Sequence, residues 1–551
     1  SRRDFLKTAA AGAAGVAAVS ALGACAGGPV GALEGSPALG AGPAMTPWSL
    51  GIDPPGITDG QCADTSRSAD VVVVGAGVAG IAAARAAVEE GASVIVIEQT
   101  GDIVVRGLCF GAVNSRFQTS LGQHIDKLEI VREMQKISGN RSNMALWMKW
   151  ANESGAAFDW FEDALKEVNY QVFPYYLEMW PLPPKFNNST EYYKQFQTSI
   201  AFGTLASDGW VPAVRIQYEK SVREGAQYVF NTRAVELAQE QGRVTGVYAQ
   251  GAEGGYLKIS ARKGVILATG DYGHNEEMVK ALCPEFYEAL NLGVTAIPTS
   301  NGDGHKMAVW AGGRMEPAPH AHMSHSFAGG FGGIGNTVTL HLNLNGKRFM
   351  NEDVPGQVFT NQLLRQPEHT SFQIFDSTWA SRIDNQNLGH GNLDLSNTFD
   401  LAATQAALDA ALTNPGPMAP LAANSLDELI ALMGLPADLA RKEIDRYNEL
   451  CAGGVDEDFG VRPDRLFPLL KPPFYASRSF VAAGVVTAGV MVDDHLRVLK
   501  AGTLLPVSGL WAVGNVAGGR YAGDYPTQAP ATSHGTAFTF GRAAGREVAL
   551  L

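Results

Sequence analysis

Three glycines near residue 75 have the spacing with which a peptide backbone binds a dinucleotide. Gly75, Gly77 and Gly80 form a Gly-x-Gly-x-x-Gly motif directly after the apolar run 71–74. The first glycine permits a tight turn, the second lets the backbone approach a pyrophosphate, and the third lets a helix pack on the preceding strand. A dinucleotide held there would supply hydride or electron transfer. The residues between the glycines share the predicted contact: Ala76, Val78 and Ala79.

The elements that must position this loop are predicted on both sides of it. A strand precedes the loop, an alanine-rich helix follows over 81–90, and a second strand runs over 93–97. Glu98 ends that strand 23 positions after Gly75, where its carboxylate can accept hydrogen bonds from ribose hydroxyls. Gln99 follows and is predicted to join the contact. An ordinary glycine turn in an α/β protein is the alternative interpretation.

Residues 1–7, Ser-Arg-Arg-Asp-Phe-Leu-Lys, are typical of an address for the twin-arginine translocase, which exports folded, cofactor-loaded proteins. The apolar stretch 9–24 is too short and too rich in glycine and alanine for a stable membrane span. It leads into Leu-Gly-Ala-Cys25, which resembles a lipoprotein cleavage box. We therefore predict an exported protein that is lipid-anchored through Cys25 at the extracytoplasmic face of the membrane. A plain leader cut nearby, with Cys25 incidental, is the alternative.

The leader bears on which dinucleotide is bound. A diffusible nicotinamide is of little use to an exported enzyme, and the chain has no second strand-embedded fingerprint for NAD(P)H. Non-covalently bound FAD fits both facts. Further FAD contacts are predicted after the strand 264–267, after the strand that begins at Gly509, and at the start of a helix over 533–548: Thr269, Gly270, Asp271, Gly514, Asn515, Ser533 and His534.

Charge and cysteine content exclude several classes of protein. A net charge of −13 argues against nucleic acid as a partner. The five cysteines form no Cys-x-x-Cys pair, so no iron–sulfur cluster or attached haem is expected in this chain. A disulfide among the last four cysteines stays open and cannot be assigned. Residues 26–67 are dominated by Gly, Ala, Pro and Ser and predict a flexible linker.

Seven motifs taken together resemble one flavoprotein family. They are Val71–Gly80, Ala268–Gly273, Gly302–Gly304, Asn345–Glu352, Pro472–Tyr475, Gly509–Asn515 and Phe540–Gly545. Through them, residues 68–551 resemble the FAD-binding fumarate reductase flavoproteins, urocanate reductases and 3-ketosteroid dehydrogenases. The resemblance implies an FAD-dependent oxidoreductase acting on CH–CH bonds, with hydride transfer at flavin N5 to or from a carbon next to an activating carbonyl. The remaining predicted FAD contacts are Asn114, Ser115, Val235 and Asp303.

The same resemblance implies an α/β fold, with a Rossmann-like FAD-binding domain split in sequence and a mobile α+β clamp (capping) domain inserted into it. The predicted divisions are a leader at 1–25, a linker at 26–67, the first part of the FAD-binding domain at 68–318, the clamp at 319–478 and the second part at 479–551. The C-terminal strand and helix must therefore return to the N-terminal strand.

Three positions depart from the fumarate reductase pattern. The proton-donating Arg of that pattern falls on Gly356, the His of its His-Thr-Met-Gly-Gly segment on Val486, and its carboxylate-clamping Arg on Tyr525. The two charges of fumarate would go unpaired in such a site, so fumarate is not the expected substrate.

Tyr525 matches a different branch of the family. It lies ten residues beyond Asn515 and is followed by Pro526, as in ketosteroid dehydrogenases, where the Tyr hydroxyl lies at the ketone oxygen of the substrate. The similarity implies that Tyr525 polarises a carbonyl or delivers a proton. The four residues after Pro526 are Thr-Gln-Ala-Pro, whereas ketosteroid dehydrogenases have a glycine-rich run there. A tyrosine packed in a turn is the alternative.

Three histidines, His320, His322 and His325, fall at the expected entrance of the clamp, where soluble fumarate reductases have a substrate-binding His. We predict His320 or His325 as a substrate contact; a surface histidine is the alternative. Zinc could bind such a cluster, but no nearby cysteine completes a site, so no metal is expected. The aromatic-rich stretch 170–193 predicts either a pocket for a planar aromatic substrate or core packing.

The leading hypothesis is an exported flavin reductase of an activated C=C bond, in an enone or an α,β-unsaturated acid. Its electrons would come from a membrane quinol or a separate haem protein. Tyr525, with His325, would stabilise the developing enolate or protonate the α-carbon. The second hypothesis is a 3-ketosteroid-type dehydrogenase, which runs the same chemistry backwards. The third is a flavin-binding electron relay or ligand receptor without turnover.

Overall fold

The computed structural model describes residues 53–170, 174–176, 194, 196–202, 206–290, 298–328, 339–354, 356–381, 401–413, 420–522 and 524–551. The predicted leader, Cys25, most of the linker and nearly all of the aromatic stretch 170–193 lie outside the described residues. Of the helices that the structure describes, none combines the length and the apolar character that a membrane crossing requires.

The larger sheet brings the two ends of the described chain together. Its eight strands run in the order β15-β16-β8-β9-β1-β2-β6, with β7 paired to β8. β1 pairs in parallel with β2 and β9, and β16, from the C-terminal part, also pairs in parallel with β9. The strands are β1 (Cys62–Val74), β2 (Val94–Ile97), β6 (Gln227–Val229), β7 (Thr232–Glu240), β8 (Arg243–Gly251), β9 (Tyr256–Leu267), β15 (Arg497–Leu499) and β16 (Pro506–Ala512).

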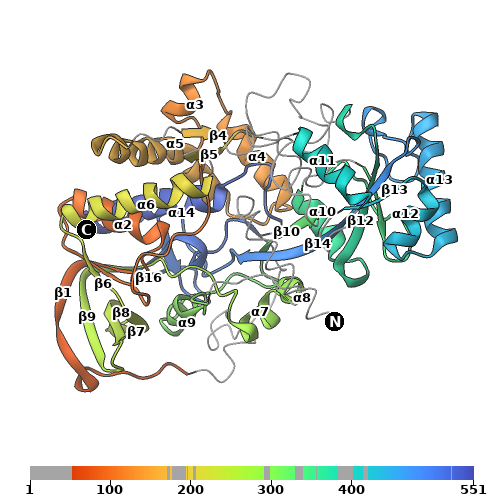
Figure 1. Ribbon diagram of the computed structural model, residues 1–551. Coiled ribbons are helices and arrows are strands. Elements are labelled where there is room, and N and C mark those ends of the chain that lie inside the picture. The colour runs from red at the N-terminus through yellow and green to blue at the C-terminus, as the bar shows by residue number, and fades with distance from the viewer. Residues whose placement is uncertain are drawn as a thin grey trace.

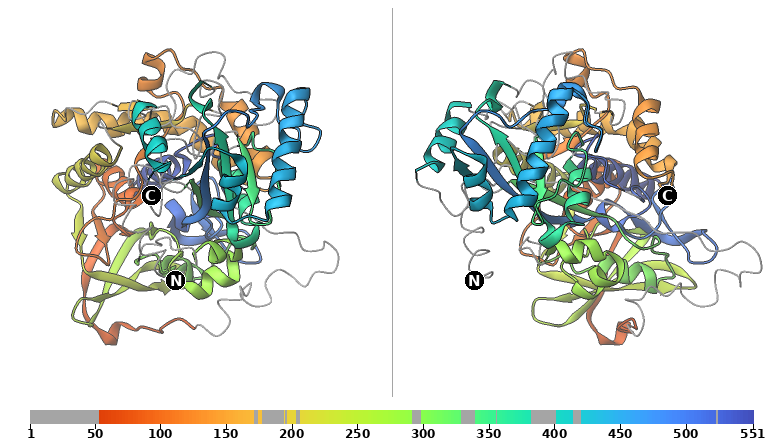
Figure 2. Two further views of the ribbon diagram at one scale, coloured as in Figure 1. Left: turned by 45° about the vertical axis from the view of Figure 1, so that its right-hand side comes forward. Right: turned by 90° about the vertical axis from the view of Figure 1, so that its right-hand side faces the viewer.

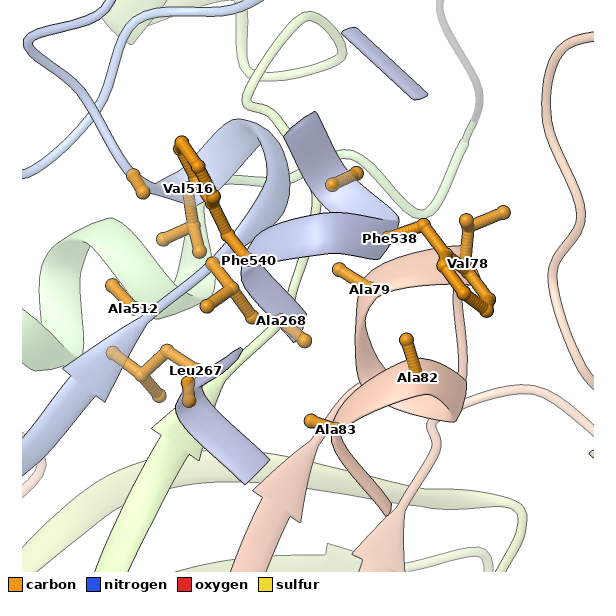
Figure 3. Close-up of a cluster of buried hydrophobic side chains, with 14 of the residues drawn as sticks. Val78, Ala79, Ala82, Ala83, Leu267, Ala268, Ala512, Val516, Phe538 and Phe540 are labelled. Atoms are coloured by element: carbon orange, nitrogen blue, oxygen red, sulfur yellow. The ribbon is translucent and has the colours of Figure 1, made fainter. Parts of the chain in front are cut away.

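Helices α2 (Val78–Glu89) and α14 (Thr532–Ala549) pack against each other on the same side of this sheet (Figure 1). Their axes can approach closely because α14 presents glycines to α2. A Cβ on Gly541 or on Gly545 would lie 2.2 Å from a backbone oxygen of α2. Figure 3 shows the small side chains of Val78, Ala79, Ala82 and Ala83 on α2 in one buried apolar cluster with residues at and just beyond the ends of β9 and β16: Leu267, Ala268, Ala512 and Val516.

A second sheet forms the core of the clamp and lies apart from the larger sheet (Figures 1 and 2). Its order is β10-β14-β12-β11, with β13 paired to β14. It has its own buried apolar cluster, and Arg348 is buried there between the carboxylates of Glu352 and Asp456, at 2.6 and 2.7 Å. The elements are β10 (His322–Ala328), β11 (Leu340–Asn343), α10 (Gly356–Leu363), β12 (Thr370–Asp376), α11 (Leu401–Ala411), β13 (Leu421–Ala423), α12 (Leu426–Met433), α13 (Ala437–Gly453) and β14 (Phe474–Val486).

A small sheet and several helices complete the described structure. The sheet has the order β3-β5-β4, and α5 and α6 pack with it around the N-terminal part of the flavin domain. These elements are β3 (Cys109–Gly111), α3 (Arg116–Ser120), α4 (Lys127–Ile137), α5 (Met144–Glu167), β4 (Pro174–Tyr176), β5 (Ser199–Phe202), α6 (Ala206–Arg223), α7 (Glu276–Leu282), α8 (Pro284–Leu290) and α9 (Asp303–Trp310).

The predicted fold class is confirmed, and the structure adjusts two of its boundaries. β1 begins at Cys62 and pairs with β9 from its first residue, so residues 62–67 belong to the sheet rather than to the predicted linker. The predicted end of the clamp at 478 falls inside β14, which crosses from the clamp towards the flavin domain. Among the described residues, Cys62, Cys109, Cys283 and Cys451 form no disulfide with one another.

Substituting Gly545 by Ala should destabilise the protein, because the new methyl group would lie 2.2 Å from the carbonyl oxygen of Ala83 in α2. We expect a loss of about 2 kcal/mol in the free energy of unfolding, the usual scale for overpacking a core. Gly453→Ala is the matched control, since Gly453 is also helical and a Cβ there meets nothing within 4 Å. Denaturant unfolding of the two variants measures the effect. Equal stability of both would refute the close approach of α2 and α14.

Candidate active site

The glycine loop after β1 is shaped to accept a phosphate group. A Cβ on Gly75 would lie 2.5 Å from the oxygen of Ala268, and one on Gly80 would lie 1.9 Å from the oxygen of Gly75. Gly77 is different, because a Cβ there would meet only Val104, at 3.6 Å. Gly77 is also the N-cap of α2 and supplies no side-chain cap. The first N–H groups of α2 therefore stay available for an anion.

Glu98 ties the loop to the end of β2. Its Oε2 accepts a hydrogen bond from the N–H of Ala76 at 2.8 Å, and its Oε1 accepts from the N–H and hydroxyl of Thr100 at 2.9 and 2.8 Å. A carboxylate oxygen can accept more than one hydrogen bond, so Oε2 keeps capacity for a ribose hydroxyl. Gln99 extends to the carbonyl of Thr299 at 3.1 Å instead.

An ion pair that the sequence analysis missed lies beside the loop that leaves β9. Asp271 is buried, and its Oδ2 pairs with Nη1 of Arg106 at 2.5 Å. Its Oδ1 accepts from the N–H of Gly273 at 2.7 Å. Thr269 and Gly270 precede it in the same loop, and Gly270 has a positive φ of 75°. Asp271 therefore has a described protein partner on each oxygen, and its predicted role at FAD stays a prediction.

Two residues that are predicted to contact FAD, Ser533 and His534, lie at the start of α14. Ser533 donates a hydrogen bond from its hydroxyl to Oδ1 of Asn515 at 3.2 Å, which joins the helix to the turn that begins at Gly514. His534 packs its ring against Gly107, and burial lowers the pKa of this imidazole to about 4. His534 is therefore neutral at physiological pH.

Tyr525 is fully buried beside this helix start. Its hydroxyl oxygen accepts a hydrogen bond from the hydroxyl of Thr532 at 3.1 Å. Burial raises the pKa of Tyr525 well above its ordinary value, so the phenol keeps its proton. Because the oxygen already accepts from Thr532, the O–H of Tyr525 can donate to a further acceptor.

Two of the three positions that depart from the fumarate reductase pattern, Gly356 and Val486, lie in α10 and at the end of β14. Gly356 is the first residue of α10, and Val486 ends β14 and is buried. From α10, the side-chain amide of Asn361 donates to Oδ2 of Asp524 at 2.5 Å, directly before Tyr525. Burial raises the pKa of the Asp524 carboxyl. The structure thus connects α10 of the clamp with the segment that carries Tyr525.

His320 does not support the substrate role predicted for it. Its ring is buried, with Nε2 at 2.8 Å from the carbonyl oxygen of Glu316 and Nδ1 at 2.7 Å from the hydroxyl of Tyr272. The carbonyl must accept, so Nε2 carries the proton and Nδ1 accepts from the Tyr272 hydroxyl. Burial lowers the pKa of His320 to about 4. Both ring nitrogens of His320 thus form hydrogen bonds within the protein interior. His325 lies in β10 opposite Ala482, but its side chain lies outside the described part.

Four other predicted FAD contacts have structural partners of their own. Asn114 is bonded through its amide to both backbone groups of Ile125, and Ser115 caps α3. Asp303 starts α9 and forms a two-pronged ion pair with Arg233 at 2.7 and 2.9 Å. Val235 lies half-buried in β7. No finding tests their contact with FAD, which stays a prediction. In the described part of the chain, no cluster of potential metal ligands is found.

A fold and site of this kind define a flavin-dependent oxidoreductase, and comparison with known proteins agrees. Residues 70–529 match the family described as FAD binding domain, and the chain belongs to this family. A vinyl phenol reductase of Lactiplantibacillus plantarum is 27% identical over 88% of this chain and 96% of its own length. A fumarate reductase (cytochrome) of Shewanella frigidimarina is 27% identical over 87% of this chain and 77% of its own length.

Solved structures show the same fold. A 3-ketosteroid-Δ4-(5α)-dehydrogenase from Rhodococcus jostii RHA1 has a TM-score of 0.67 at 22% identity, and the match covers 90% of this chain and all of the other. A flavocytochrome c3 fumarate reductase in its open conformation has a TM-score of 0.62 at 22% identity, over 89% of this chain and 79% of that one. FAD is therefore the cofactor, and the uncapped start of α2 beside Gly77 suits its pyrophosphate.

Gly77→Ala should weaken FAD binding while leaving the fold intact. The backbone of Gly77, at φ −81°, suits any residue, and a Cβ there meets no atom closer than 3.6 Å. The methyl group would instead occupy the space that the pyrophosphate needs, so we expect about tenfold weaker binding or more. Flavin absorbance per mole of protein measures retention, with Gly60→Ala as the control because a Cβ at Gly60 meets nothing within 4 Å. Normal FAD content in Gly77→Ala would contradict this assignment.

Glu316 gives the site region a predicted pH dependence. Its oxygens accept from the N–H groups of Gly489 and Gly519, at 3.2 and 2.6 Å, and burial raises the pKa of the carboxyl from 4.5 to about 7. Between these two pH values the folded protein holds a proton that the unfolded chain has lost. The free energy of unfolding should therefore fall as pH rises from 4.5 to 7, by an amount on the order of 3 kcal/mol.

Thermal or denaturant unfolding across that pH range tests this expectation. In Glu316→Gln the titrating group is gone, so this part of the pH dependence should disappear. The amide nitrogen would also face a backbone N–H, which should cost about 1–3 kcal/mol at all pH values. A variant with an unchanged pH profile would show that another group is responsible.

Proposed function

We propose that this protein is an exported reductase of a C=C bond that is conjugated with an electron-withdrawing oxygen function, such as an enone or an α,β-unsaturated acid. What is established is coarser: the chain is an FAD-dependent oxidoreductase of a family whose members act on C=C and C–C bonds. The observation that carries the proposal is the buried hydroxyl of Tyr525, whose proton is retained and can be donated.

In this proposal the protein activates the substrate through its oxygen. When bound and reduced by the electron donor, FAD would supply the hydride for the β-carbon and be reoxidised. The O–H of Tyr525 donates a hydrogen bond to the carbonyl oxygen and stabilises the negative charge that develops there. Its raised pKa keeps the phenol protonated and makes it a reluctant acid, so its proposed role is to stabilise charge through a hydrogen bond rather than to transfer its proton. His325 remains the proposed proton carrier for the α-carbon.

The residues around Tyr525 favour a substrate other than a dicarboxylate. Gly356, Val486 and Tyr525 place no cation at the three positions where the fumarate reductase pattern has Arg, His and Arg. Two carboxylates would be left without these partners in a water-poor site. Among relatives, the names vinyl phenol reductase and urocanate reductase are consistent with a reductase whose substrate is not fumarate.

Electrons are proposed to come from a membrane quinol or from a separate haem protein. The chain has no Cys-x-x-Cys pair that could attach a haem and no second dinucleotide fingerprint for NAD(P)H. The leader at residues 1–7 and Cys25 support an exported, membrane-tethered enzyme that meets such a donor at the membrane surface. The names of relatives include a cytochrome-containing fumarate reductase, which is consistent with this proposal.

Desaturation of a ketosteroid is the second candidate, and a specific observation favours it. Tyr525 and Pro526 match the ketosteroid dehydrogenase pattern, and such a dehydrogenase shares the fold. The reduced protein should be mixed with enones, enoates and vinyl phenols, and the oxidised protein with saturated ketosteroids. Flavin reoxidation by the first group supports the reductase. Flavin reduction by the second group alone supports the dehydrogenase. No reaction with either would favour an electron relay or ligand receptor.

Tyr525→Phe should lower kcat by about 100-fold or more with the true substrate, because the donor at the carbonyl oxygen is lost. The fold should persist, since the ring is kept and the hydroxyl loses only its hydrogen bonds with Thr532 and with the backbone of Ser533. Tyr228→Phe is the control; its hydroxyl bonds Ser221, and it lies in β6 away from the site. Steady-state kinetics with FAD content matched between variants measures the effect. Unchanged turnover would remove Tyr525 from its proposed role.

A further inference from the structure

Arg106 lies where the three parts of the FAD site meet. The N–H of Val104 donates to the carbonyl of Ala76 in the glycine loop at 3.2 Å. Gly107, on the other side, packs so closely on His534 in the first turn of α14 that a Cβ there would lie 1.9 Å from the ring. The backbone at Arg106 is itself held, because its carbonyl accepts from the indole N–H of Trp210 at 3.0 Å. The backbone at Arg106 is therefore fixed between the starts of α2 and α14.

The side chain of Arg106 is anchored on one side and open on the other. Nη1 pairs with Asp271 at 2.5 Å, and Nη2 donates to the carbonyl of Gly484 in β14 at 3.3 Å. Asp271 is 2% exposed, whereas the Arg106 side chain is 28% exposed. A guanidinium has five N–H donors, so these two contacts leave others for a further acceptor. The buried Asp271 carboxylate thus holds the Arg106 guanidinium in one orientation.

The position of FAD follows from the elements around this cation. With its pyrophosphate at the start of α2, the flavin end must extend along the edge formed by the carboxyl ends of the parallel strands. That edge is lined by the loop after β9, which carries Asp271, and by the turn at Gly514 and the start of α14. Arg106 contacts the loop after β9 directly, through Asp271, and its neighbour Gly107 contacts the start of α14.

We propose that Arg106, oriented by Asp271, is an electrostatic positioning residue that faces the flavin ring and stabilises the negative charge of the reduced cofactor. A two-electron reduced flavin at neutral pH is an anion. A cation in a partly buried place favours that anion strongly, because solvent screening is weak. Arg106 would raise the reduction potential of FAD, so that a mild donor such as a quinol can reduce it. The proposal concerns the cofactor alone and does not depend on which substrate is used.

Two charge substitutions with opposite signs test this inference in the FAD-loaded protein. Arg106→Gln removes the cation, and Asp271→Asn removes its counter-charge. The readouts are the midpoint potential of the flavin and the dissociation constant of sulfite, which adds to oxidised flavin and gives an adduct with the same anionic ring. Arg106→Gln should lower the potential and weaken sulfite binding at least about tenfold. Asp271→Asn should shift both quantities in the opposite direction, with sulfite binding at least about threefold tighter.

The opposite signs distinguish this role from a merely structural one. If the ion pair only held the fold together, both variants would damage the site and shift sulfite binding in the same direction, which would overturn the proposal. If Arg106 instead paired with an anionic group of the substrate, both flavin readouts would stay unchanged, which would also overturn it. Should Arg106→Gln lose its FAD, Asp271→Asn alone decides: tighter sulfite binding supports the proposal, and weaker or unchanged binding refutes it.

Discussion

The close packing of α2 against α14 is the contact on which the rest of the site depends. α2 has an uncapped start that suits a pyrophosphate, and α14 begins with Thr532 and Ser533, which form hydrogen bonds with Tyr525 and Asn515. The two helices come from opposite ends of the described chain and touch through Gly541 and Gly545. The FAD site therefore cannot form from either part alone. Because the clamp is inserted between these two parts, the chain must leave the flavin domain and return to it at neighbouring points. The antiparallel pairing of β10 with β14 brings these two points together.

Local features of the site could be predicted from sequence, whereas features made by distant segments could not. The glycine loop is encoded by residues 75–80 and by the strand and helix beside them, so its position in the fold followed from spacing. The pair Arg106–Asp271 joins residues 165 positions apart, and only the fold brings them together. Arg106 carries no motif of its own. Its only sequence signal is a charge in a short segment between two predicted parts of the FAD site.

His320 illustrates the opposite case, in which residue type suggested a substrate contact but the structure gives both ring nitrogens partners inside the protein. A histidine near a domain junction is a reasonable substrate contact, but this one is surrounded by Tyr272 and the carbonyl of Glu316. Burial favours the neutral form of the His320 imidazole, and both ring nitrogens form hydrogen bonds inside the protein. The same physics keeps Tyr525 protonated and His534 neutral.

The clamp helix α10 contacts the residue before Tyr525, and β14, which leaves the clamp, contacts Arg106, so the position of the clamp would be coupled to the proposed chemistry. Asn361 of α10 donates to Asp524, the residue before Tyr525, and the carbonyl of Gly484 in β14 accepts from Arg106. A clamp that moves to admit substrate would have to change one or both contacts. Opening would then release the turn that holds the Tyr525 phenol and free one donor of the Arg106 guanidinium. Closure would restore both contacts, so the groups proposed to polarise the substrate and to stabilise the reduced cofactor would reach their working geometry together, once the substrate is enclosed.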